Sequence, residues 1–123
     1  MQKSPQDLEE RTEDFALRVI RLYRALPNDD VAKVLGKQLL RAGTSIGANY
    51  HEAARARSKA EFIAKVGDSL REANESAYWL RLLLRAAILP EDKLCAIHSE
   101  CCELIAIFIA SLNTAKSKPE KDA

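Results

Sequence analysis

The spacing of the apolar residues constrains this chain more than any other feature of its sequence. Apolar positions recur in alternating steps of four and three along most of the chain, and the first series is Leu8, Thr12, Phe15, Val19, Leu22 and Leu26. Such spacing forms one stripe along an α-helix, whereas a strand would need strict alternation, which no segment shows. The sequence therefore predicts an all-α protein.

Three short breaks divide this pattern. They are "LPNDD", "RARSK" and "ILPEDK", and Ser58 with Glu61 forms a capping box at the second break. We expect helices over residues 5–25, 30–55, 59–88 and 91–114, the first capped by Ser4, and a mobile polar tail over 116–123. Because short connections join antiparallel neighbours, residues 5–115 should form an up-down-up-down antiparallel four-helix bundle.

Length and composition fit one globular domain. The chain has 123 residues, of which 47% are hydrophobic and 30% charged, so it is neither disordered by composition nor membrane-like. No uninterrupted apolar run approaches the roughly 20 residues of a spanning helix. The polar start "MQKSPQDLEERTED" lacks the apolar region of a secretory signal, so we expect a cytoplasmic location and no membrane partner.

Charge is unevenly distributed although the formal net charge is only +1. Residues 1–14 carry five carboxylates against two cations, and residues 31–65 carry seven cations against two carboxylates. Such runs are commonly solvated helix faces, but the asymmetry leaves room for an acidic partner.

Gly43 and Gly47 stand one turn apart in the middle of the second predicted helix. A phosphate-binding loop would need a preceding strand and a lysine beside a serine or threonine, and the sequence has neither. Each glycine costs a helix about 1 kcal/mol relative to alanine, so a close contact should compensate. We expect both glycines to allow close packing of another helix.

The four-and-three spacing continues through the second helix but becomes polar, in the series Val31, Leu35, Gln38, Ala42, Ser45, Asn49 and Glu52. If this stripe packs on the third helix, a structural polar network should form from Arg41, Ser45, Asn49, Glu52, Arg57, Glu72, Glu75 and Trp79. An unpaired buried polar group costs about 1–3 kcal/mol, so we expect Arg57 to be a buried partner of one of the glutamates. Ligand binding at this network is the alternative.

Signs of catalysis or of a cofactor are missing from the sequence. Di-metal bundles use Glu-x-x-His pairs, yet neither His51 nor His98 lies three residues after a glutamate. Cys95 is three residues from His98, but no acid is placed to orient that histidine. We expect no enzyme activity, no metal and no cofactor, and we interpret the three cysteines as small apolar residues.

The fourth helix is apolar around most of its circumference. Its main stripe is Leu94, Ile97, Cys101, Leu104, Phe108 and Leu112. Cys102, Ile105 and Ile109 extend the apolar surface beyond that stripe. A helix apolar on most sides is buried on most sides, so these three residues are candidates for a contact between subunits.

Two stretches carry a family resemblance, "QLLRAGTSIGANYHEAARARSKAEFIAKV" and "SLREANESAYWLRLLLRA". They resemble the bacterial four-helix-bundle family first known from open reading frames in intervening sequences of the 23S ribosomal RNA gene. The matching residues lie within 38–87: Arg41, Ala42, Ser45, Ile46, Ala48, Asn49, Glu52, Arg57, Ser58, Phe62, Glu72, Glu75, Trp79 and Leu80. Gly67 and Asp68 depart from the apolar pair expected there.

The resemblance implies a homo-oligomer, with a ring of five favoured, and no established enzymatic role. It also implies a relationship to the accessory variability protein of diversity-generating retroelements, which works with a reverse transcriptase and nucleic acid. Two functions follow as expectations: an oligomeric interaction protein, or an RNA- or DNA-binding accessory module. The second would use the cations Lys37, Arg41, Arg55, Arg57, Lys59 and Lys65.

Overall fold

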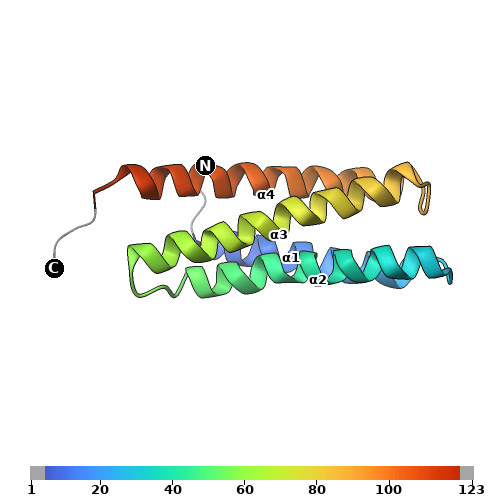
Figure 1. Ribbon diagram of the computed structural model, residues 1–123, viewed down its shortest axis with the longest axis horizontal. Helices are drawn as coiled ribbons and strands as arrows, with labels where there is room; N and C mark the ends of the chain where they lie inside the picture. The colour runs from blue at the N-terminus through green and yellow to red at the C-terminus, as the bar shows by residue number, and fades with distance from the viewer. Residues whose placement is uncertain (1–4, 120–123) are drawn as a thin grey trace.

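Four antiparallel helices make up the part of the chain that the computed structural model describes, residues 5–119 (Figure 1). They are α1 (Pro5–Ala25), α2 (Asp30–Ala53), α3 (Lys59–Arg85) and α4 (Glu91–Ser117). Each helix packs on the next along the chain, and α4 returns beside α1 with the sparsest contact of the four. The predicted all-α, up-down-up-down bundle is confirmed.

Side-chain caps fix where α2 and α3 begin. The carboxylate of Asp29 accepts a 3.1 Å hydrogen bond from the backbone N–H of Ala32. At α3 the Ser58 hydroxyl accepts from the N–H of Glu61 at 3.0 Å, while the Glu61 carboxylate accepts from the N–H of Arg57 at 2.7 Å. The box is thus closed one residue upstream of the cap itself. The predicted cap of the first helix, Ser4, lies outside the described residues.

The C-terminal ends of three helices differ from the expected ones. α3 stops at Arg85, three residues early, because Ala87 adopts a left-handed conformation with φ 54°. The N–H of Ile88 bonds the carbonyl of Leu83 at 3.1 Å, which closes a Schellman motif. α2 also ends early, at Ala53.

α4 extends three residues past its expected end and stops at Ser117. The predicted tail, residues 116–123, therefore begins inside a helix, and its last four residues lie outside the described part of the chain.

The core follows the predicted stripes of α1 and α4, in which every member is buried. α2 is different: its buried face is Ala32, Gly36, Leu39, Ala42, Gly43, Ile46, Tyr50 and Ala53. The expectation that the series starting at Val31 is the packed stripe was wrong, since Val31 is 56% exposed. Small residues form much of the true face, and they allow α1 to approach closely.

The glycines of α2 face α1. A Cβ added at Gly43 would lie 2.9 Å from Cγ2 of Val19, and one added at Gly47 would lie 3.2 Å from Oγ1 of Thr12. By contrast, a Cβ at Gly67 of α3 would meet no atom within 4 Å. Gly43 and Gly47 thus mark the close approach of two helices, and Gly67 does not.

Candidate interaction surfaces

An ion cluster joins the middle of α2 to α3. Arg41 contacts the carboxylates of Glu72, at 3.4 Å, and Glu75, and the indole N–H of Trp79 donates to Glu75 at 3.0 Å. The pKa of Glu75 is lowered, chiefly by the Trp79 hydrogen bond and then by Arg41, while partial desolvation opposes the shift. Arg41 is about half exposed, so this cluster lies at the surface of the α2–α3 flank.

The other polar residues expected in one network are separate from that cluster. The Ser45 hydroxyl donates to the carbonyl of Arg41 and the Asn49 amide to the carbonyl of Ser45, so both bond within their own helix. Glu52 pairs with Lys65 of α3 at 2.7 Å. Four of the eight residues therefore share one cluster, Ser45 and Asn49 bond within α2, and Glu52 makes a separate ion pair between α2 and α3.

The predicted burial of Arg57 was wrong. It was expected to be buried against a glutamate, but it is exposed, and within residues 5–119 its guanidinium makes no ion pair with a carboxylate. Arg57 lies in the turn between α2, which ends at Ala53, and α3, which begins at Lys59, so its side chain is off the packed faces of the helices.

Several cations considered for nucleic-acid binding already have partners. Arg41 and Lys65 pair with glutamates, Arg55 contacts Glu9 at 2.8 Å, and the Lys59 ammonium donates to the carbonyl of Lys118. Of the six, Lys37 and Arg57 are exposed and lack a carboxylate partner among the described residues.

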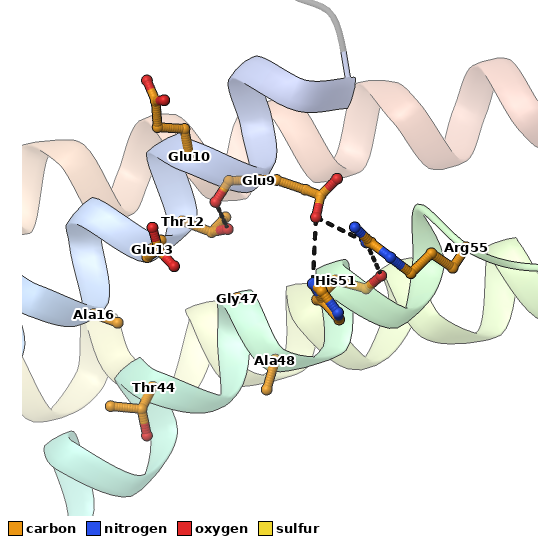
Figure 2. Close-up of a pocket in the computed structure, with 10 residues that line it drawn as sticks. All are labelled: Glu9, Glu10, Thr12, Glu13, Ala16, Thr44, Gly47, Ala48, His51 and Arg55. Carbon is orange, nitrogen blue, oxygen red and sulfur yellow. Dashed lines mark hydrogen bonds and ion pairs between the residues drawn. The ribbon is translucent and has the colours of Figure 1, made fainter.

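A cleft of about 570 Å³ lies between α1 and α2 (Figure 2). Glu9 of α1 reaches across it and contacts both Nδ1 of His51 at 3.3 Å and Arg55, which are in the last turn of α2 and just beyond it. The pKa of Glu9 is lowered, mainly by the Arg55 hydrogen bond. This contact was not predicted, although the acidic start of the chain and the basic end of the second helix signalled it.

The polar groups in this cleft hold α1 and the end of α2 together. The Thr12 hydroxyl donates to the carbonyl of Glu9 at 2.9 Å, so it is not presented as a nucleophile. His51 is 61% exposed and has Glu9 as its partner. Within residues 5–119 no three metal-ligating side chains gather into a candidate metal site.

A second contact between helices, an ion cluster that the sequence did not predict, joins α1 to α4. The guanidinium of Arg11 binds both carboxylate oxygens of Glu100, at 2.7 and 2.8 Å, and also Glu103 at 2.7 Å. Arg11 and Glu100 are each less than one-fifth exposed. Bidentate, shielded pairs of this kind are stronger than ordinary surface ion pairs, so Arg11 secures the bundle's sparsest contact.

The outer face of α4 remains apolar and uncovered. Over the most apolar 18-residue window of α4 the mean hydropathy is 1.6, yet only 28% of that window is buried. By length and composition alone this helix could cross a membrane. Ile109 is 45% exposed, Cys102 is exposed and Ile105 is partly buried, so the three predicted contact residues do lie on one accessible side.

The buried and exposed cysteines have different surroundings. Cys101 is fully buried, its thiol contacts the carbonyl of Ala73 at 3.2 Å, and burial raises its pKa to about 12. Cys95 and Cys102 are exposed, and the thiol of Cys102 lies 3.9 Å from Nδ1 of His98. Cys101 therefore acts as a core residue, while Cys102 is part of the open face of α4.

The comparisons with known proteins agree with this fold. A crystal structure of a Bacteroides thetaiotaomicron protein of unknown function, from the S23 ribosomal protein family, is 38% identical. The alignment covers 89% of this chain and 97% of that one, with a TM-score of 0.82. No functionally curated protein matches the chain. The 23S rRNA-intervening sequence protein family matches residues 6–110, which is most of the sequence, and the chain therefore belongs to that family.

Proposed function

We propose that this protein is a non-enzymatic interaction protein that assembles with copies of itself through the outer face of α4. The contact would be centred on Cys102, Ile105 and Ile109. The observation that carries the proposal is the mismatch in α4, which is the most apolar helix by mean hydropathy and yet is mostly unburied in a single chain. A contiguous apolar face of this kind is typical of a subunit contact.

The charges beside this face favour a protein partner over a lipid one. The adjoining side of α4 carries Glu100 and Glu103, which are held by Arg11 of the same bundle. A membrane-spanning position would place those charges in hydrocarbon, which is costly. A copy of the same chain covers the apolar stripe and leaves the charged side in water. The free thiols Cys95 and Cys102 suit a reducing compartment, so we place the assembly in the cytoplasm.

The number of subunits is part of the proposal. The family resemblance favours a ring of five, which would have a mass of about 68 kDa, five times the 13.7 kDa chain. A ring is built from heterologous contacts that close by rotation, so the face of α4 would meet a different surface of its neighbour. The exposed Val31 and Val34 of α2 and Tyr78 of α3 are the complementary apolar groups we assign to that surface.

Replacing Ile109 with glutamate tests this proposal. A charge at the centre of the apolar face should shift the mass measured by light scattering from a multiple of 13.7 kDa toward that of the single chain. Leu112→Glu would be uninformative because Leu112 is buried in the core, so the control is Ala64→Glu at an exposed position of α3, which should keep the wild-type mass. An Ile109→Glu variant that keeps the full assembly would refute the assignment.

Nucleic-acid binding is the second candidate function. The observation that favours it is the turn between α2 and α3, where Arg55, Arg57 and Lys59 lie within five residues and only Arg55 has a carboxylate partner among the described residues. The B. thetaiotaomicron relative is assigned to a ribosomal protein family, which is consistent with an RNA partner. The other three cations expected to contribute are Lys37, Arg41 and Lys65.

The test is oligonucleotide binding at two salt concentrations. If the turn neutralises phosphates, affinity should fall steeply with salt, and the triple variant Arg55→Gln, Arg57→Gln, Lys59→Gln should bind more weakly on every sequence with a shallower salt slope. Lys116→Gln, an exposed cation elsewhere, is the control. Failure of the wild type to bind at low salt would exclude this function and leave the assembly proposal intact.

A further inference from the structure

The exposed stripe of α1 carries opposite charges on its two halves. We define the α1 stripe as six exposed residues at helical spacing: Glu10, Glu13, Asp14, Leu17, Arg21 and Arg24. Its first half is acidic, its second half is basic, and Leu17, which is 43% exposed, lies at the centre. Figure 2 shows Glu10 directed away from α2. None of its charged side chains forms an ion pair with another residue in the described part of the chain.

The stripe is antisymmetric about Leu17. Glu10 lies seven residues before Leu17 and Arg24 seven residues after it, while Glu13 lies four before and Arg21 four after. If two copies of α1 meet antiparallel on a two-fold axis at Leu17, a residue n positions before Leu17 faces the residue n positions after it on the other copy. Both pairs then become glutamate opposite arginine. A parallel pairing would instead oppose like charges.

We propose that the α1 stripe is a docking surface for a second copy of this chain, in an antiparallel, two-fold symmetric helix pair centred on Leu17. Each such contact would make four glutamate–arginine pairs around one leucine–leucine contact. The surface is separate from the outer face of α4 and does not depend on the assembly proposed above.

Interactions within α1 do not explain the charge pattern of the α1 stripe. The helix dipole favours acids and bases only in the first and last turns. Glu13 is the ninth residue of α1 and Arg21 is the fifth from its end, so both lie beyond that range. Moreover, Glu10 with Asp14 and Arg21 with Arg24 are like-charged neighbours at spacings of four and three, which destabilise a helix that stands alone. Opposite charges from a second copy would relieve both repulsions.

The experiment uses two double variants of the full chain. R21E/R24E makes every charge of the α1 stripe acidic, and E10R/E13R leaves Asp14 as its single acid beside four arginines, so each variant should repel itself. We expect the wild type to double its mass by light scattering when sodium chloride is lowered from about 500 mM to about 50 mM, because screening of exposed charges falls. Neither double variant alone should double, and an equal mixture of the two should.

Three controls make the outcome decisive. Ile109→Glu leaves the α1 stripe intact, so at low salt it should still pair and reach twice the mass of its high-salt form, whether or not α4 forms a contact. Circular dichroism verifies that the variants fold, and if either double variant unfolds, Leu17→Lys replaces it by placing like charges on the two-fold axis. If the stripe bound nucleic acid instead, the more basic E10R/E13R would bind it more strongly than the wild type does. Pairing of copies predicts the opposite order, because E10R/E13R alone should not double its mass. Equal masses at low and high salt for the wild type and the mixture would overturn the proposal.

Discussion

The glycines of α2 and α3 provide a sharp test of the packing described above. Gly43 and Gly67 are both inside helices, but only Gly43 has another helix against it. Replacing a helical glycine with alanine favours folding by about 1 kcal/mol when there is room for the methyl group. At Gly67 there is room, so Gly67→Ala should stabilise the protein by about that amount.

At Gly43 the new methyl would lie 2.9 and 3.1 Å from the two γ-carbons of Val19. Val19 is fully buried, and its branched side chain has one preferred rotamer in a helix, so it cannot easily move aside. Overpacking of this kind costs about 1–3 kcal/mol. After the gain in helix propensity of about 1 kcal/mol, Gly43→Ala should be neutral to destabilising by about 2 kcal/mol.

Urea denaturation at one fixed protein concentration measures the difference. Gly43→Ala should be about 1–3 kcal/mol less stable than Gly67→Ala. In a Val19→Ala background the γ-carbons are gone, so Gly43→Ala should then become stabilising, and the double-mutant cycle should show a coupling of about 1–3 kcal/mol. If Gly43→Ala stabilised the wild type as much as Gly67→Ala does, Val19 would not be in tight contact with position 43.

Three further predictions concern other parts of the bundle. Ala87→Gly should stabilise by about 1 kcal/mol, measured by thermal unfolding, because a left-handed residue with a side chain is strained; loss of stability would contradict this. Arg11→Met should lower the free energy of unfolding, measured in urea, by about 1–3 kcal/mol, because Glu100 loses its bidentate partner. Glu103→Gln, at an exposed carboxylate, should lower it by less than about 1 kcal/mol. Equal losses in the two variants would contradict this difference in burial. The pKa values of Glu9, Glu52 and Glu75 are lowered in the folded protein, so on acidification the unfolded chain takes up protons before the folded one does. Stability should therefore fall as pH drops through the ordinary carboxyl range. Arg41→Gln should make this pH dependence shallower, and an unchanged slope would contradict the contribution of Arg41 to the lowered pKa of Glu75.

Local features of the sequence were sufficient for the fold. Helix starts depend on neighbouring residues, as at Asp29 and Ser58, and the stripes of α1 and α4 are long and apolar. The buried face of α2 was misjudged because alanine and glycine form much of it, while Val31 and Leu35 offered a more apolar series on another side. Periodicity identifies a helix reliably, but it identifies the inward face only when the large apolar residues lie there.

The spacing of residues along the chain does not by itself determine the polar contacts, which also depend on which helices are neighbours and how they are rotated. Arg41 meets Glu72 and Glu75 because α2 and α3 are adjacent in the chain and joined by a short turn. The pairing of Arg11 with Glu100 joins residues 89 positions apart, and it is set by how α1 and α4 are rotated about their axes. Arg57 was misplaced because it lies in the turn between α2 and α3, where helical spacing does not say whether a side chain meets the bundle or solvent.

If another copy covers the outer face of α4, the mass of the unmodified chain in solution should show it. Light scattering should be measured at micromolar protein concentration in about 500 mM salt, where pairing between exposed charges is screened and apolar burial is retained. We expect a mass several times 13.7 kDa, with about 68 kDa for the proposed ring, and a mass of 13.7 kDa across that concentration range would rule out assembly through α4.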